Sequence, residues 1–124
     1  MAADKSPAAT SASVLDEVFE TIRERQRLLP EGSYVTHLLS GGIDRIARKV
    51  GEESIEVVLA AKNETPDELT AELADLWFHC LVLLAQSGGV PEDIYQELAK
   101  RHGKRPSFQV KAEAQSRLPS IEDT

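Results

Sequence analysis

Two groups of acidic residues have the spacing that divalent-metal chemistry requires. The first is Glu53 and Glu56, and the second is Glu72 and Asp75. Each pair is spaced i, i+3, so on a helix each would place two carboxylates about one turn apart on one face. Two such pairs on facing antiparallel helices form a four-carboxylate cage. Mg²⁺ and Mn²⁺ prefer oxygen ligands and keep open positions for water and phosphate oxygens, so the pattern predicts a site for such a cation.

The segment around the second acidic pair is otherwise apolar. On a helical projection, Glu68, Glu72, Asp75, His79 and Gln86 fall within about 60° of one another. A helix of this kind is expected inside a bundle or at an oligomer interface, where its acids are partly desolvated. Two carboxylates about 4 Å apart at an effective dielectric of 20 repel by roughly 4 kcal/mol. The segment has no Lys or Arg, so a divalent cation is the expected compensation.

The first acidic pair belongs to a segment that carries bases as well. Glu52 lies as close to Glu56 around the helix as Glu53 does, so spacing alone does not decide which of them joins the site. Glu52 and Glu53 are both candidates for the general base that activates an attacking water. Arg45 and Lys49 share this stripe and either contact substrate phosphates or form intrahelical ion pairs.

Four further features allow a functional and a structural interpretation. His79 lies one turn beyond Asp75 and either contacts a ribose, supports the site, or is a structural histidine. Trp77 is expected in the core or at an interface rather than under a nucleotide base. Gly41-Gly42 is interpreted as a helix break rather than a phosphate-binding loop. Cys80, the one cysteine of the chain, is expected to be a small core residue, and it excludes a Cys-based zinc site and an internal disulfide.

Every element expected to position these residues is a helix. Apolar residues recur at helical spacing, no six-residue stretch alternates apolar and polar residues, and no Asn-Gly or Asp-Gly turn occurs. The predicted fold class is all-α: an up-and-down helical bundle of four main helices plus a short helix. The helices are expected at about residues 14–29, 34–39, 43–62, 66–86 and 91–101.

Several of the predicted helix ends depend on capping residues. Asn63 is expected to take the left-handed position after the helix that carries Glu53. The residues expected to cap helix N-termini are Ser13 (with Asp16), Ser33, and Thr65 (with Pro66 and Glu68).

Length and charge restrict the classes of protein. The 124 residues suffice for one domain, expected at 13–103, between a disordered tail at 1–12 and a tail or short helix at 104–124. The formal net charge of −7 disfavours nucleic acids and anionic membranes as partners. No apolar stretch resembles an export signal or approaches the roughly 20 residues that span a bilayer. We therefore expect a cytoplasmic protein.

Two stretches of the chain resemble a known family. They are SYVTHLLSGGIDRIARKVGEESIEVVLAAKN and ELADLWFHCLVLLAQSGG, within about residues 33–101. They contain the E-E-x-x-E and E-x-x-D patterns of the all-α nucleotide pyrophosphohydrolases, the MazG-like proteins. The leading Ser-Tyr…Leu-Leu…Gly segment and the Lys-Val-Gly-Glu-Glu run are similar to those of the phosphoribosyl-ATP pyrophosphatases of histidine biosynthesis.

The resemblance implies an activity and a set of ligands. The expected reaction is Mg²⁺-dependent hydrolysis of the nucleotide phosphoribosyl-ATP to phosphoribosyl-AMP and pyrophosphate, with Mn²⁺ as a substitute ion. The family's metal-binding acids correspond to Glu53, Glu56, Glu72 and Asp75, with Glu52 adjacent. The resemblance also implies a cytoplasmic homo-oligomer, in the first place a homodimer.

Two departures from the family and two other functions accompany this expectation. Trp77-Phe78 stands where Leu-Tyr is expected, which removes a hydroxyl. The cyclohydrolase portion fused to some relatives is missing, so the next pathway step is expected on another protein. The alternatives are a house-cleaning dNTP pyrophosphohydrolase of the same fold, and a non-catalytic helical dimer or adaptor whose acids form a solvated surface.

Overall fold

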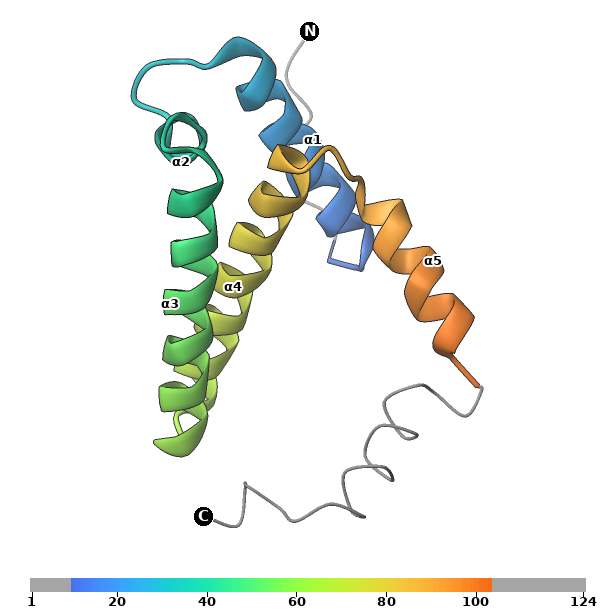
Figure 1. The fold of residues 1–124 in the computed structure, drawn as a ribbon. Coiled ribbons are helices and arrows are strands. Elements are labelled where there is room, and N and C mark those ends of the chain that lie inside the picture. The colour runs from blue at the N-terminus through green and yellow to red at the C-terminus, as the bar shows by residue number, and fades with distance from the viewer. Residues whose placement is uncertain (1–9, 104–124) are drawn as a thin grey trace, which may run out of the picture. The chain divides into compact units, whose positions relative to one another are not determined.

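The computed structural model describes residues 10–103, and these residues form five helices and no strand (Figure 1). The prediction of an all-α fold with four main helices and one short helix is confirmed. The expected tail at 104–124 and most of the tail at 1–12 lie outside the described residues. The helices are α1 (Ser13–Leu28), α2 (Tyr34–Ser40), α3 (Gly42–Lys62), α4 (Pro66–Gln86) and α5 (Pro91–Arg101).

The chain divides into two compact units, Met1–Pro91 and Glu92–Thr124. Helices α1 to α4 belong to the first unit, and almost all of α5 belongs to the second. Helix α5 has acidic residues in its first turn and basic residues in its last, which suits the helix dipole. Its last turn also holds an ion pair, in which Nε of Arg101 lies 2.9 Å from Oε2 of Glu97. No single helix of the described chain is long and apolar enough to cross a bilayer.

The two N-terminal caps proposed for α1 and α2 have different outcomes. Ser13 is the first helical residue of α1, whereas Ala12 occupies the N-cap position and provides no side-chain hydrogen bond. The predicted capping box at Ser13 is therefore wrong. Ser33 does cap α2, because its Oγ accepts a hydrogen bond from the backbone N–H of Thr36 at 3.3 Å.

The connection between α3 and α4 also differs from its prediction in detail. Asn63 has a right-handed conformation with φ −84°, and Glu64 takes the left-handed one with φ 56°. Thr65 and Pro66 occupy the N-cap and first helical positions of α4 as predicted. The hydroxyl of Thr65 donates to Oε2 of Glu68 at 3.0 Å and does not accept from the backbone, so the reciprocal capping box is absent.

The hydrophobic core lies where α1 and α2 meet the beginning of α3 and the end of α4. Its four most deeply buried large side chains come from one helix each: Ile22, Leu38, Ile46 and Val82. Burial of a side chain of this size stabilises a fold by roughly 1.5–3 kcal/mol. This end of the bundle therefore supplies most of the packing that fixes the four helices.

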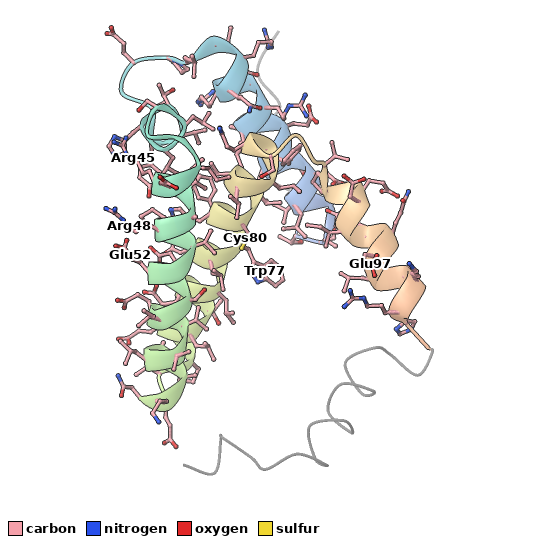
Figure 2. All side chains as sticks on the ribbon, viewed as in Figure 1. Arg45, Arg48, Glu52, Trp77, Cys80 and Glu97 are labelled. Atoms are coloured by element: carbon pink, nitrogen blue, oxygen red, sulfur yellow. The ribbon has the colours of Figure 1, made fainter. Side chains whose placement is uncertain are left out.

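Helices α3 and α4 form an antiparallel hairpin whose connected end extends beyond α1 and α2 (Figure 1). Large apolar side chains stay exposed along it: Ile55, Val58 and Leu59 on α3 and Trp77 on α4. Trp77 is 56% exposed, and Figure 2 shows it standing out from α4 together with Cys80. Cys80 is also exposed, so its assignment to the core is wrong. Its surroundings still desolvate the sulfur and raise the pKa of the thiol.

Candidate functional site

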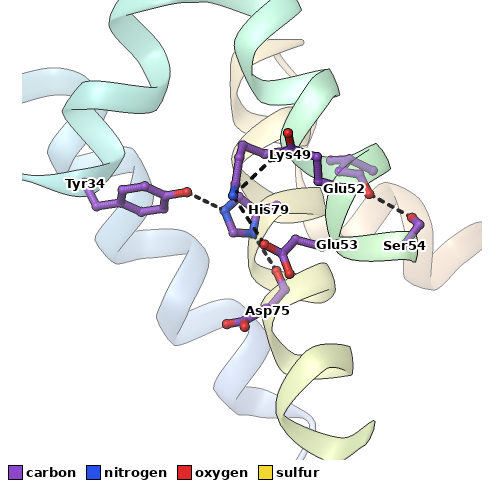
Figure 3. A network of polar contacts seen from close by, with 8 residues as sticks. Tyr34, Lys49, Glu52, Glu53, Ser54, Asp75 and His79 are labelled. Carbon is purple, nitrogen blue, oxygen red and sulfur yellow. Dashed lines mark hydrogen bonds and ion pairs between the residues drawn. The ribbon is translucent and has the colours of Figure 1, made fainter. Parts of the chain in front are cut away.

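The antiparallel packing of α3 and α4 brings acids from both predicted pairs together. Glu53 lies on α3, whereas Glu72 and Asp75 lie one turn apart on α4. One carboxylate oxygen from each of these three residues lies within 4.8 Å of the other two. We call Glu53, Glu72 and Asp75 the acidic cluster. Glu53 and Glu72 are half-buried and Asp75 is exposed, and the side chain of Glu53 is only 13% exposed (Figure 3).

The acidic cluster is electrostatically strained. Desolvation raises the pKa of Glu72, and the negative charges of Glu53 and Asp75 raise it further. A hydrogen bond with Glu53 and the charge of Glu56 act in the same direction. The structure therefore favours a proton, or another positive charge, at this point.

Lys49 is the cation that contacts the cluster. Its Nζ lies 3.4 Å from Oε1 of Glu53 and 3.4 Å from Oε1 of Glu52. Burial by itself would lower the pKa of Lys49. The charges and hydrogen bonds of Tyr34, Glu53 and Glu52 outweigh that effect, and the net shift of the pKa is upward. Lys49 is thus held as an ammonium.

The donor set suits a hard divalent cation. All three ligand atoms are carboxylate oxygens, which Mg²⁺ and Mn²⁺ prefer over nitrogen or sulfur. Oxygens bound to one Mg²⁺ at about 2.1 Å lie roughly 3 to 4 Å apart, close to the spacing within the cluster. Glu53, Glu72 and Asp75 therefore fit such an ion after small side-chain rotations.

Two other predicted acids lie outside the cluster. Glu56 is exposed and is close enough to Glu72 to raise its pKa, but it does not meet the 4.8 Å spacing. Glu52 is exposed and points away from the hairpin (Figure 2). Helical spacing alone could not decide between Glu52 and Glu53. The structure places Glu53 in the acidic cluster and Glu52 at its edge. Metal binding by these acids, and the identity of the base, stay predictions.

His79 is buried and both of its ring nitrogens are engaged. It is 5% exposed, its Nδ1 lies 2.7 Å from the carbonyl oxygen of Asp75, and its Nε2 lies 2.8 Å from the hydroxyl of Tyr34 (Figure 3). This arrangement leaves no ring nitrogen for a ribose, and it agrees both with a structural histidine and with one that supports the site. No role for Tyr34 was predicted from the sequence, although Ser-Tyr is among the residues that carry the family resemblance.

Arg45 lies in the first turns of α3, and its side chain contacts the C-terminal end of α2. Its Nη1 donates to the carbonyl oxygen of His37 at 2.6 Å and lies 3.4 Å from Oγ of Ser40. The rest of the guanidinium lies against Gly41, in space that a Cβ atom there would occupy. Gly42 has φ 72°, so the Gly41-Gly42 step is the predicted helix break. The contacts of Arg45 stabilise this break, and a phosphate contact would require the side chain to move.

A helical bundle with a carboxylate cluster in its α3–α4 hairpin defines the general class: an all-α protein with an oxygen-donor site. Comparison with known sequences narrows the class. Residues 15–102 match the family described as Phosphoribosyl-ATP pyrophosphohydrolase, and the chain belongs to this family. It is accordingly an enzyme, a hydrolase that acts on a phosphoanhydride.

Individual relatives are of two lengths. The chain is 48% identical over 99 residues to the phosphoribosyl-ATP pyrophosphatase of Lactiplantibacillus plantarum, covering 80% of this chain and 93% of the relative. The pyrophosphatase of Methylococcus capsulatus is 46% identical over 90 residues, which is 73% of this chain and 86% of the relative. The histidine biosynthesis bifunctional protein HisIE of Thermus thermophilus is 52% identical over 95 residues, or 77% of this chain. The chain spans only 44% of that bifunctional relative.

Proposed function

We propose that this protein hydrolyses phosphoribosyl-ATP to phosphoribosyl-AMP and pyrophosphate in histidine biosynthesis, and that the reaction depends on Mg²⁺. The observation that carries the proposal is the convergence of Glu53, Glu72 and Asp75 across the α3–α4 hairpin. The names of the relatives supply the substrate. Phosphoribosyl-ATP is a polyphosphate nucleotide, and the net charge of −7 would repel it unless the site were locally positive.

Each side chain of the site has a part in this chemistry. Glu53, Glu72 and Asp75 would hold the cation, and Glu56 lies close enough to join them after a side-chain rotation. Bound there, Mg²⁺ would neutralise charge on the leaving pyrophosphate and orient a water for in-line attack on phosphorus. Mn²⁺ has the same ligand preferences and is the proposed substitute.

The positively charged side chains of the site and the carboxylate that accepts the proton of the attacking water lie on α3. The proton of the attacking water passes to Glu52 or Glu53, the two carboxylates that Lys49 contacts. Lys49 lies at the edge of the cluster, where it can contact a phosphate oxygen. Arg45 would contact a substrate phosphate only after its guanidinium has left the carbonyl oxygen of His37.

A pyrophosphate-release assay with phosphoribosyl-ATP tests the proposal directly. Wild-type protein is expected to be active with Mg²⁺ and inactive with EDTA. Glu53→Gln and Glu72→Gln should each lose more than about 100-fold in kcat, because each removes a charged ligand. Glu17→Gln on α1, which removes one exposed acid outside the cluster, is the control and should keep wild-type activity.

Three outcomes would contradict the proposal in different ways. Equal activity with and without Mg²⁺ would exclude the metal-dependent mechanism. Faster turnover of a dNTP than of phosphoribosyl-ATP would favour the house-cleaning alternative. No turnover of any nucleotide, together with no effect of Mg²⁺ on thermal unfolding, would favour the non-catalytic dimer or adaptor.

We also propose that the protein acts as a homodimer in the cytoplasm. The exposed apolar side chains of the hairpin, including Ile55, Val58 and Trp77, support a second copy as the partner. A two-helix hairpin buries only one face of each helix, and several exposed side chains of this size on one hairpin support an interface there. The cytoplasmic setting is supported by the nucleotide substrate.

A further inference from the structure

One hydroxyl connects helix α2 to the backbone of the acidic cluster. The hydroxyl of Tyr34 lies 2.8 Å from Nε2 of His79, across the boundary between α2 and α4. Nδ1 of the same ring lies 2.7 Å from the carbonyl oxygen of Asp75, one turn earlier on α4. Asp75 is a member of the acidic cluster. A chain of two hydrogen bonds therefore leads from α2 to a residue of the site (Figure 3).

The direction of both hydrogen bonds follows from the acceptor at one end. A carbonyl oxygen only accepts, so Nδ1 of His79 carries the proton and donates to Asp75. In a neutral ring Nε2 is then the acceptor, and the hydroxyl of Tyr34 is the donor. The two bonds support each other, because each favours the tautomer and the ring orientation that the other needs.

The packing around Tyr34 fixes where its hydroxyl lies. Its ring stacks on Phe78 with a centroid distance of 6.3 Å and an interplanar angle of 22°, and it meets the ring of His79 edge-on at 5.7 Å. Ser33 caps the helix that Tyr34 begins, and Arg45 holds its other end through the carbonyl of His37. The ring position is therefore determined by contacts that the hydroxyl does not make.

We propose that Tyr34 is a positioning residue for the acidic cluster, acting through His79 on the turn of α4 that carries Asp75. A histidine mid-helix that donates to the carbonyl four residues earlier restrains that turn. The hydroxyl of Tyr34 keeps the histidine ring in place. This inference rests on the proposed function, in that the acidic cluster is taken to bind a divalent cation. Residues that orient metal ligands in this way typically change metal affinity by 10–100-fold when substituted.

The first test requires no metal and no substrate. In NMR spectra of the metal-free protein, the Nδ1–H proton of His79 should be visible, because its hydrogen bond to Asp75 and its burial slow exchange with water. In Tyr34→Phe, which keeps the ring and its stacking, that resonance should broaden or disappear as the imidazole gains mobility. Tyr95→Phe removes the chain's other tyrosine hydroxyl and should leave the resonance unchanged. An unchanged resonance in Tyr34→Phe would overturn the proposal.

The second test measures Mg²⁺ affinity by calorimetry in the absence of nucleotide. Tyr34→Phe should weaken Mg²⁺ binding about 10-fold, whereas Tyr95→Phe should not. Because Tyr34 is proposed to act through His79, the double variant Tyr34→Phe/His79→Leu should bind Mg²⁺ as weakly as His79→Leu alone. Losses that multiply in the double variant would show that Tyr34 acts independently, and wild-type affinity in Tyr34→Phe would show that it does not act at all.

Activity separates positioning from substrate binding. Tyr34→Phe should lower kcat at limiting Mg²⁺ and recover at saturating Mg²⁺, with an unchanged KM for the nucleotide. A raised KM that excess Mg²⁺ does not restore would overturn the proposal in favour of a direct substrate contact. If wild-type protein does not bind Mg²⁺, the proposed function fails. The Nδ1–H resonance would still decide whether Tyr34 restrains His79.

Discussion

Three carboxylates converge on one point of the hairpin, and the ammonium of Lys49 contacts only Glu53 among them. Of these three residues, Glu72 has a raised pKa, because desolvation and the neighbouring acids disfavour its charged form. Functional sites often retain groups that destabilise the fold but bind a ligand strongly. The residues of the acidic cluster are therefore expected to affect stability and metal binding in opposite directions.

The first prediction concerns Glu72→Gln in metal-free protein. The pKa of Glu72 is raised above 4.5 on folding, so folding favours its protonated form. The stability that this provides is present at low pH and is lost as pH rises through the raised pKa. Gln is neutral throughout, so in EDTA Glu72→Gln should raise the Tm at pH 7 and change it little at about pH 4. Thermal unfolding by circular dichroism at both pH values measures this.

Added Mg²⁺ should reverse the order of the two proteins. Wild type should gain thermal stability with rising Mg²⁺ by mass action, and Glu72→Gln should gain much less. Glu17→Gln should follow wild type under every condition. A Tm for Glu72→Gln below that of wild type in EDTA at neutral pH would contradict the strain inferred at this carboxyl.

At the scale of elements, α2 is too short to be stable by itself. A helix of seven residues is marginal in water, so contacts with the other helices must hold it. Val35 and Leu38 are buried in the core, and Ser33 and Arg45 satisfy its two ends. Helix α2 is thus a rigid support that presents the ring of Tyr34 to α4.

The second prediction uses a defect in this helix. Among the described residues, Oγ1 of Thr36 is the buried side-chain polar atom that has no hydrogen-bond partner. Thr36→Val replaces that hydroxyl by a methyl group of similar size and should stabilise the fold by about 1 kcal/mol. Urea unfolding should show a higher midpoint with an unchanged m-value. The control Thr21→Val on exposed α1 surface should change stability by less than about 0.5 kcal/mol. A lower midpoint for Thr36→Val would indicate that the hydroxyl has a partner.

The helices were predictable from the sequence, and so was the one-turn spacing within each acidic pair, because both depend on spacing along one chain. The structure nevertheless leaves Glu56 outside the acidic cluster. Capping at Ser33 and the break at Gly41-Gly42 were likewise correct, since local chemistry determines them. The caps proposed at Ser13 and Asn63 were wrong, because neighbouring residues fill the same positions. Helix boundaries are the level at which such local competition is decided.

Contacts between helices were not predictable in the same way. Spacing gives the direction of a side chain around its own helix, but not which helix lies opposite. The choice of Glu53 over Glu52, and the bond from Tyr34 to His79, depend on how α2, α3 and α4 pack. The apolar run around Cys80 predicted burial inside the bundle or at an oligomer interface, and the further assignment of Cys80 to the core was wrong, because Cys80 is exposed in the single chain.

At the scale of the whole molecule, the third prediction concerns assembly. Light scattering after size-exclusion chromatography should give the mass of a dimer for wild type. Ile55→Glu and Trp77→Glu place charges on exposed apolar surface of the hairpin and should each give a monomer. Leu98→Glu on α5 is the control, because Leu98 is 61% exposed but lies outside the hairpin. If Leu98→Glu gave a monomer and the two hairpin variants did not, the interface would lie on α5. A monomeric wild type would exclude the dimer.

The core and the acidic cluster lie at different places along α3 and α4, and this separation affects how the protein opens. Within the described part of the unit Met1–Pro91, the far turns of α3 and α4 extend beyond α1 and α2 and pack on each other, so in a single chain they should exchange amide hydrogens with solvent before the turns around Ile46 and Val82. A ligand bound by Glu53 on α3 and by Glu72 and Asp75 on α4 would link the two helices of this less stable end. Substrate and ion would then slow breathing of the hairpin near the site, while the packed end hardly responds.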